Sequence, residues 1–192
     1  NLVAFIDMAY QGFADSIKQD AAALDLFSAS GLQFFVSSSF SKSFSLYGER
    51  VGALTIVTDS KDESARVLSQ VKRVIRTNYS NPPTHGGAVV AAVLSSPELR
   101  QMWEDELGGM RDRIRAMRTS LVANLKAEGA PNFDFINVQR GMFSYTGLTA
   151  AQVEKMRADY GIYAVGTGRI CVAALNTKNI GYVAKAIAAV LK

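Results

Sequence analysis

Residues 37–50 gather most of the side chains in this chain that could do chemistry. Serines surround a single lysine, Lys42, and the stretch ends at Arg50. A phosphate group needs several hydrogen-bond donors at one point, and hydroxyl and guanidinium groups supply them. An aldehyde needs an amine that can lose its proton, and Lys42 is the candidate. Composition alone favours another interpretation, a serine-rich surface loop with an ordinary lysine.

Apolar runs that alternate with a helical pattern predict the elements around this stretch. A continuous apolar run at 2–6 predicts a buried parallel strand that ends at Asp7. Strands are also predicted at 33–38 and 51–58. A short helix is predicted at 21–30. Because the chain opens directly on a strand, we expect it to be the C-terminal part of a longer protein.

Three helices are predicted after the third strand. The first covers 60–79, and the second, 86–94, is small and apolar and is therefore expected to be buried. The third is long, begins at a cap on Ser95 or Ser96, and keeps apolar residues at threes and fours until Gly129. Its tryptophan and methionines are expected to pack in the core instead of binding a cofactor.

The pattern changes beyond the long helix. Short strands are predicted at 133–138, 142–145, 162–165 and 170–173. They alternate with two helices, one opened by a capping box of Thr149 and Gln152 and the other opened by Asn176. We therefore expect a large domain over 1–108 and a small α/β domain over 109–192, bridged by the long helix.

Charge and composition exclude several classes of function. The net charge is +4, but basic residues are interspersed with acidic ones, so no nucleic-acid partner is expected. The densest basic group is expected to form a solvated helix face, and it comprises Arg111, Arg113, Arg115 and Arg118. No apolar run reaches the roughly 20 residues that cross a membrane, so no membrane partner is expected.

The remaining single residues of interest have structural interpretations. Cys171 is the only cysteine, which fits a cytoplasmic location, and it is expected to lie in the core. His85, the only histidine, has no partner visible in the sequence and is expected to be structural. No cluster of cysteine and histidine predicts a metal site, so no metal is expected.

The order of residues around Lys42 is more specific than their composition. Ser39-Phe40-Ser41-Lys42, followed eight residues later by Arg50 and then by Val51-Gly52, resembles the lysine signature of class I aminotransferases, which depend on pyridoxal phosphate (PLP). Three further segments resemble the same family at the expected separations, namely Asp7–Phe13, Asn78–Pro83 and Gly168-Arg169. The resemblance covers essentially the whole chain and is closest to the aspartate and aromatic (tyrosine) subgroup.

The resemblance implies a fold-type I PLP-dependent transferase of the α/β class. Full-length members are about twice as long as this chain, because large two-domain enzymes exceed the size of a single core. The chain would supply the C-terminal part of the large, mainly parallel-sheet domain and the small α/β domain. The family's ring-stacking aromatic residue and its second set of phosphate donors would lie upstream, so this piece alone is expected to be inactive.

The resemblance also implies a role for each matching position near Lys42. Lys42 would carry PLP as a Schiff base and serve as the acid and base of the reaction. Asp7 would pair with the pyridine nitrogen and keep it protonated, and Tyr10 would donate a hydrogen bond to the phenolic oxygen of the ring. The phosphate would be held by Ser39, Ser41 and Arg50.

Further positions would bind the substrates. By the same resemblance, Arg169 would bind the α-carboxylate, and Phe143 would be an aromatic wall contributed by the small domain. Arg76 would reach across a homodimer with shared active sites to the second carboxylate of a dicarboxylic substrate, with Ser80 also serving the neighbouring site. Ordinary alternatives are a surface cation for Arg76 and a core residue for Phe143.

The expected activity is that of an aromatic-amino-acid aminotransferase. It would transfer an amino group from tyrosine or phenylalanine to 2-oxoglutarate by a ping-pong reaction. The aromatic preference rests on residues 43–50 and 141–148, which resemble the tyrosine branch more closely. Two alternatives stay open: an aspartate aminotransferase, and a PLP-binding effector domain of a transcription regulator, which would carry a helix-turn-helix ahead of this region.

Overall fold

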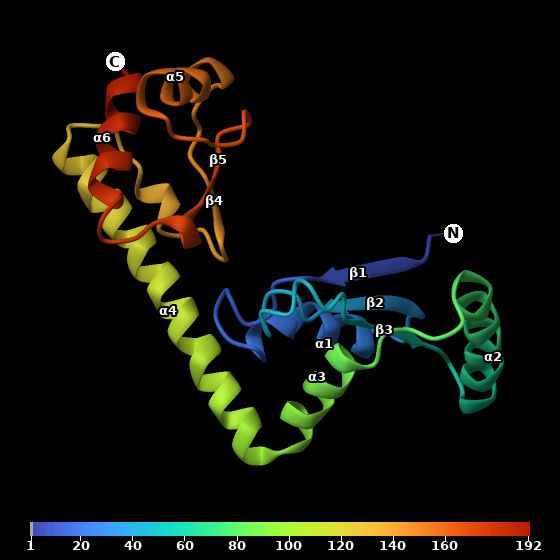
Figure 1. Cartoon of the computed structure of the whole chain (residues 1–192). Helices are drawn as coiled ribbons and strands as arrows, with labels where there is room; N and C mark the ends of the chain where they lie inside the picture. The colour runs from blue at the N-terminus through green and yellow to red at the C-terminus, as the bar shows by residue number, and fades with distance from the viewer. Residues whose placement is uncertain (1) are drawn as a thin grey trace. The chain divides into compact units, whose positions relative to one another are not determined.

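A computed structural model describes residues 2–192, which divide into two compact units. The first unit runs up to Gly12 and resumes over Ser16–Leu107, and the second comprises Phe13–Asp15 and Gly108–Lys192. The long helix α4 (Pro97–Ala127) supplies residues to both units, as the yellow-green ribbon in Figure 1 shows. The short segment Phe13–Asp15 was not expected to belong with the C-terminal part of the chain.

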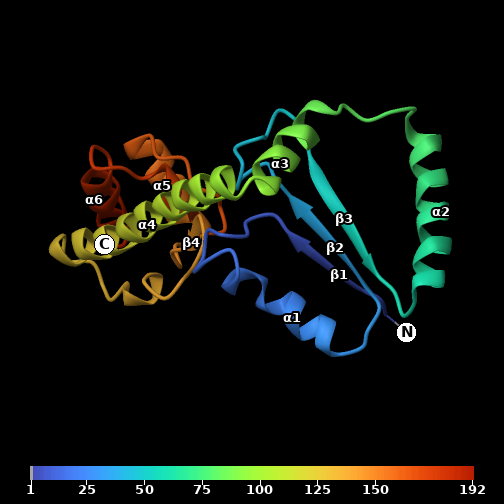
Figure 2. The same cartoon turned by 90° about the horizontal axis from the view of Figure 1, so that it is seen from below.

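The first unit is built on a sheet of three strands. The strands β1 (Ala4–Met8), β2 (Phe34–Ser39) and β3 (Gly52–Val57) lie side by side in that order (Figures 1 and 2). All three predicted strands are confirmed. β1 and β2 pair in parallel, with α1 (Ala22–Ala29) in their connection, whereas β3 runs antiparallel to β2. The connection between β2 and β3 has no crossover helix, and a parallel pairing would need one.

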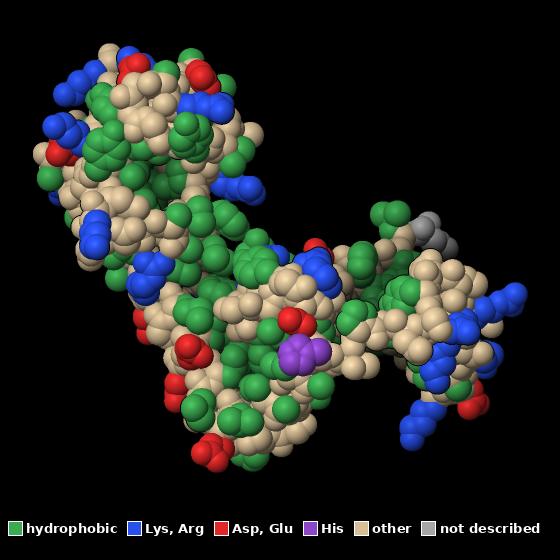
Figure 3. All heavy atoms as spheres, viewed as in Figure 1, with side chains coloured by type: hydrophobic (Ala, Val, Ile, Leu, Met, Phe, Trp, Pro, Cys, Tyr) green, Lys and Arg blue, Asp and Glu red, His purple; other side chains and the backbone are tan. Residues whose placement is uncertain are grey.

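The sheet is less buried in this chain than the apolar pattern suggested. β1 alternates between half-buried and exposed residues, and Phe5 is 64% exposed, so the expectation of a buried first strand is wrong for the described chain. Hydrophobic side chains are also exposed at Leu54 on β3 and Leu68 on α2 (Lys61–Asn78). Figure 3 shows green hydrophobic side chains at the surface of the protein. An open apolar groove separates α2 from β2 and β3.

The helices of the first unit begin at the residues that their sequence signals indicate. Ser60 caps α2, because its hydroxyl accepts the backbone N–H of Glu63 at 3.2 Å. Ser96 accepts the N–H of Leu99 at the start of α4. The small helix α3 (His85–Ser95) was expected to be buried, but only Gly86 and Val90 are buried in it. Small residues permit burial and do not require it, and His85 itself is exposed.

The second unit packs short elements against the C-terminal part of α4. They are η2 (Asp134–Ile136), β4 (Phe143–Tyr145), α5 (Ala150–Tyr160), β5 (Arg169–Cys171), η3 (Val172–Ala174) and α6 (Ile180–Val190). β4 and β5 form an antiparallel pair. The core residues with 0% exposure are Leu121, Leu125, Ile136, Met156, Val172, Ala184, Ala186 and Ile187. The capping box at Thr149 and Gln152 is confirmed.

Two predicted strands of the second unit are wrong. Residues 133–138 contain the helical turn η2, because Phe133 and Ile136 are three residues apart and both point into the core. Residues 162–165 form no regular element. Short apolar runs cannot be assigned to a strand or a helix by periodicity alone. The last helix, α6, begins later than expected, because Asn176 instead makes a turn that accepts the N–H groups of Lys178 and Asn179.

The basic group on α4 and the single cysteine also differ from expectation. Arg113 and Arg115 are exposed as expected, and Arg113 donates to the carbonyl oxygens of Ala173 and Leu175. Arg118, however, is only 4% exposed, so the expectation of a solvated face is wrong for this residue. Cys171 is exposed and does not lie in the core. Exposure on a two-stranded ribbon depends on what covers each face, which periodicity does not report.

The described residues include neither a membrane-spanning helix nor a metal-binding cluster. Over residues 2–192, no helix is both long enough and apolar enough to cross a membrane. Within the same range, no group of three or more histidine, cysteine, aspartate or glutamate side chains is placed to hold a metal ion.

Candidate active site

Lys42 lies in the connection between β2 and β3, directly beyond the end of β2. The connection is closed at its base by the N–H of Phe40, which donates to the carbonyl of Val51 at 3.2 Å. Within it, the N–H of Phe44 donates to Phe40 and that of Ser45 donates to Lys42, each at 3.2 Å. These bonds fold residues 40–45 into a tight turn, so the backbone of Lys42 is held on both sides.

The Lys42 ammonium group lies over the faces of two tyrosines. Its nitrogen is 4.6 Å from the ring centroid of Tyr10 and 5.7 Å from that of Tyr47. Both separations permit cation–π attraction, which directs the lysine toward the segment that follows β1. The sequence motif singled out Tyr10, whereas Tyr47 was missed as a site residue. The only sign of Tyr47 in the sequence was that it is an aromatic residue within the same connection.

Asp7 stands near the carboxyl end of β1, opposite Ser37 in the parallel pair. The Ser37 hydroxyl donates to one Asp7 carboxylate oxygen at 2.8 Å. Because parallel strands end at the same edge of a sheet, the carboxyl ends of β1 and β2 bring this carboxylate and the serine-rich stretch together. The hydrogen bond orients the carboxylate.

The residues expected to hold a phosphate lie on the same connection. Ser41 is 7% exposed, and its backbone N–H donates to the Ser39 hydroxyl at 3.2 Å. Arg50 adopts the left-handed region with φ 53°, and its guanidinium donates to the carbonyl of Tyr47 at 2.8 Å. A side chain at Gly52 would come within 2.9 Å of the Ser38 carbonyl oxygen, so the backbone here requires glycine.

An aromatic cluster of Phe40, Phe44 and Trp103 supports the Lys42 turn from one side. Trp103 on α4 stacks on Phe44 with ring centroids 4.5 Å apart, and Phe44 meets Phe40 edge to face at 5.5 Å. The indole N–H donates to the carbonyl of Ser43 at 2.7 Å. Trp103 was expected to pack, and it does, but it also fixes the residue next to Lys42. No local sequence signal reveals this contact.

Within residues 2–192, Arg76 makes no hydrogen bond or ion pair with the Lys42 turn. It is exposed on α2, and within the described chain its guanidinium donates to the carbonyl and hydroxyl oxygens of Ser80. The structure therefore brings together the two residues that the sequence assigned to a neighbouring site. The charged Arg76 guanidinium stays in solvent, where a carboxylate could pair with it.

Arg169 and Phe143 belong to the second unit. The guanidinium carbon of Arg169 lies 4.9 Å from the ring centroid of Phe143, across the β4–β5 pair. Gly168 precedes Arg169 with φ 85°, and a side chain there would come within 2.7 Å of the Leu148 carbonyl oxygen. The aromatic face and the glycine turn therefore hold an exposed guanidinium in one orientation.

The groups around Lys42 match the needs of a phosphorylated aldehyde with a ring nitrogen. The amine lies over aromatic faces, the serine hydroxyls and Arg50 offer donors for a phosphate, and the Asp7 carboxylate can accept a proton-bearing nitrogen. The Ser41 hydroxyl makes no hydrogen bond to a described residue, so it is available as a donor. The residues present fit PLP.

The comparisons with known proteins agree on one family. The model of the aminotransferase class I and II family matches residues 1–187. The chain is 70% identical to an aspartate aminotransferase of Pseudomonas aeruginosa and 51% identical to an aromatic-amino-acid aminotransferase of Escherichia coli, over 98% and 99% of its length.

A solved structure extends the comparison to three dimensions. The aromatic-amino-acid aminotransferase of Burkholderia pseudomallei, covalently bound to pyridoxal phosphate, is 74% identical and superimposes on the whole chain with a TM-score of 0.97. The chain covers 48% of that protein and 48% of each curated relative. It therefore spans about half the length of the proteins that it matches.

Proposed function

The chain belongs to the class I and II aminotransferase family, and from this membership we propose that it supplies the Lys42-bearing half of a PLP-dependent aromatic-amino-acid aminotransferase. The observation that carries the proposal is the placement of Lys42. Its amine lies over the Tyr10 ring, on a turn flanked by Ser39, Ser41 and Arg50. A relative with the same fold at 74% identity binds PLP covalently.

Lys42 is proposed as the covalent anchor and as the group that moves the proton. When bound, PLP supplies an electron sink that stabilises negative charge at the substrate's α-carbon. Once the substrate amine has displaced it from the cofactor, the freed Lys42 amine would take the proton from that carbon. Tyr10 and Tyr47 limit the directions in which the lysine can point, because its charged form is attracted to both ring faces.

Asp7, Tyr10 and the phosphate donors are proposed to orient the cofactor. The Asp7 carboxylate, itself held by Ser37, keeps a proton on the pyridine nitrogen. The Tyr10 hydroxyl donates to the phenolic oxygen of the ring. Ser39, Ser41 and Arg50 bind the phosphate, and Arg50 can engage two oxygens at once.

Two arginines are proposed to bind the carboxylates of the substrates. Arg169, held against Phe143, binds the α-carboxylate that every amino acid carries. Arg76 binds the second carboxylate of a dicarboxylic substrate such as 2-oxoglutarate, in the neighbouring subunit of a homodimer. Ser80 then releases the Arg76 guanidinium, a hydrogen-bond exchange at an exposed site that costs little. A complete protein that stays monomeric and fully active would contradict the dimer.

Aspartate aminotransferase is the second candidate activity. The 70% identical relative from Pseudomonas aeruginosa is named as one, whereas the 74% identical solved structure is named as an aromatic aminotransferase. The aromatic preference is supported by residues 43–50 and 141–148. The ratio of kcat/KM for phenylalanine, tyrosine and aspartate, measured on the complete protein, distinguishes the two activities.

The test of the proposed function is an absorbance titration of the complete protein with PLP. A visible band that is absent in Lys42→Ala is expected, and it should shift when tyrosine is added, with release of the 2-oxo acid. A Lys42-dependent band that no amino donor changes would instead support the regulator alternative. A protein that develops no band would refute the assignment of PLP to this chain.

A further inference from the structure

A polar cavity in the second unit collects four arginines away from Lys42. The cavity has a volume of about 360 Å³, and its basic lining comprises Arg111, Arg115, Arg118 and Arg140. Three of these residues lie on successive turns of α4, and Arg140 lies on the segment that precedes β4. The spacing of three and four residues places the α4 arginines on one face of the helix.

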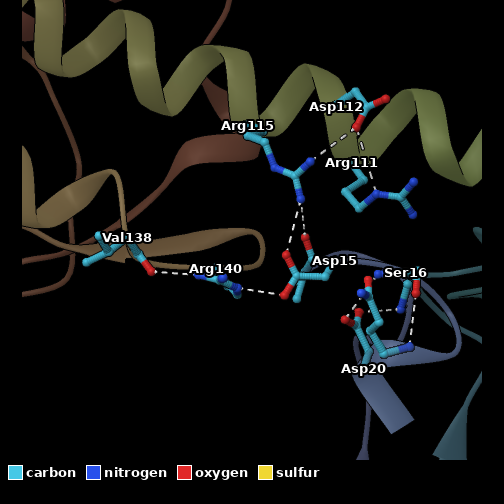
Figure 4. A network of polar contacts seen from close by, with 11 residues as sticks. Asp15, Ser16, Asp20, Arg111, Asp112, Arg115, Val138 and Arg140 are labelled. Atoms are coloured by element: carbon cyan, nitrogen blue, oxygen red, sulfur yellow. Dashed lines mark hydrogen bonds and ion pairs between the residues drawn. The ribbon is translucent and has the colours of Figure 1, made fainter. Parts of the chain in front are cut away.

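The Asp15 and Asp112 carboxylates pair with three of these guanidinium groups. The Asp15 carboxylate lies between Arg115 and Arg140, at 3.4 and 2.7 Å, as Figure 4 shows. Asp112 lies 3.8 Å from Arg111 and 3.7 Å from Arg115 and is largely exposed.

Arg118 is the member whose charge is least balanced. It is 4% exposed, and its guanidinium donates to the Ser144 hydroxyl at 3.2 Å and to the Gly141 carbonyl, both neutral groups. No ion pair joins it to a carboxylate in the described chain. Burial lowers the pKa of Arg118, and the positive charges of Arg115 and Arg140 lower it further. A buried charge without a counter-charge is costly, so an anion would be stabilised here.

We propose that this cavity is a binding site for a small oxyanion such as inorganic phosphate or a short dicarboxylate. Arg118, buried and without an ion pair to a described carboxylate, supplies the charge that such an anion would balance. Planar guanidinium groups bind phosphate and carboxylate oxygens in pairs. The exposed Asn137 amide on the same lining supplies a further donor. The site uses none of the residues assigned to the aminotransferase reaction.

Asp15 and Arg140 have opposite roles in such a site. Arg140 would bind the anion, whereas the Asp15 carboxylate would compete with it for Arg115 and Arg140. Replacing Asp15 by asparagine should therefore strengthen anion binding, and replacing Arg140 by glutamine should weaken it. A general effect of net charge would weaken binding equally in Arg140→Gln and in a variant that loses an arginine elsewhere on the second unit.

The test is calorimetric titration of the complete, PLP-loaded protein with inorganic phosphate at constant ionic strength. Loaded PLP keeps phosphate from the Lys42 site, and Arg169→Gln shows whether the substrate site contributes. A parallel titration with succinate distinguishes a preference for phosphate from one for dicarboxylates. Chloride serves as the monovalent reference. Arg157→Gln is the matched control, because Arg157 is an exposed arginine of the same unit that pairs with Glu154.

The expected result is binding of either dianion that weakens about tenfold in Arg140→Gln, the effect of one lost charge-assisted hydrogen bond. Asp15→Asn should bind more tightly, by about threefold or more, and Arg157→Gln should bind as the parent does. The same differences between variants are expected in an Arg169→Gln background, where the proposed substrate site has lost its contact with carboxylates. Absence of binding in the parent, or equal affinities in Asp15→Asn and Arg140→Gln, would overturn the proposal. Because the readout is binding heat, it does not depend on aminotransferase activity.

Discussion

The hydrogen bond from Trp103 to Ser43 gives a sharp test of how Lys42 is positioned. Trp103→Phe keeps a ring that can stack on Phe44 but removes the donor that reaches the Ser43 carbonyl at 2.7 Å. Losing this bond should cost about 1–3 kcal/mol, since the half-buried carbonyl is left unsatisfied. We expect the free energy of unfolding to fall by that amount. We also expect PLP affinity to fall about fivefold or more, because the Lys42 turn loosens.

A second hydrogen bond of the same length provides the control. The Tyr182 hydroxyl donates to the Tyr160 carbonyl at 2.7 Å in the second unit. Tyr182→Phe should also lower stability, by about 1 kcal/mol, and leave PLP affinity unchanged. Urea unfolding gives the first quantity, and titration of the visible PLP band gives the second. If Trp103→Phe loses stability while its PLP affinity equals that of Tyr182→Phe, then the indole only packs and the positioning argument is wrong.

Three further predictions concern the second unit. Phe143→Leu removes the ring that lies 4.9 Å from the Arg169 guanidinium. In steady-state kinetics it should raise KM for amino acids about two- to fivefold at nearly constant kcat. An unchanged KM would mean that the ring does not orient Arg169. Gly168→Ala should lower the free energy of unfolding by about 2 kcal/mol or more, because φ is 85° and the Leu148 carbonyl lies within 2.7 Å; urea unfolding measures it. Thr149→Ala removes the capping box and should lower the free energy of unfolding by about 1 kcal/mol while leaving KM unchanged. A changed KM would mean that α5 affects substrate binding.

Long periodic segments of this fold could be predicted from sequence. The α4 helix was expected from apolar residues at threes and fours, and it extends over Pro97–Ala127. The capping box at Thr149 was predicted because both partners lie within one turn of the chain. The strands predicted at 133–138 and 162–165 were wrong, since a run of a few apolar residues fits a helical turn or an irregular segment equally well.

The sequence by itself determined which residues can do the chemistry. Lys42, Arg50 and their serines are local in the chain, and a strand before them places them at the edge of a sheet without further information. Asp7 was expected at the end of a parallel strand, whereas its hydrogen bond with Ser37 is known only from the structure. Residue type and spacing are enough where the partners lie within a few residues of one another.

Only the tertiary structure decided which groups support the chemistry and which charges are buried. Trp103 reaches Ser43 from sixty residues away, and Arg118 is buried on a helix whose pattern indicated a solvated basic face. Such contacts depend on how segments that are distant in the sequence pack together. Neither periodicity nor composition tells which distant segments come into contact. The same basic residues can lie in water or line a cavity, and the energy of their charges differs between the two because burial removes their solvent.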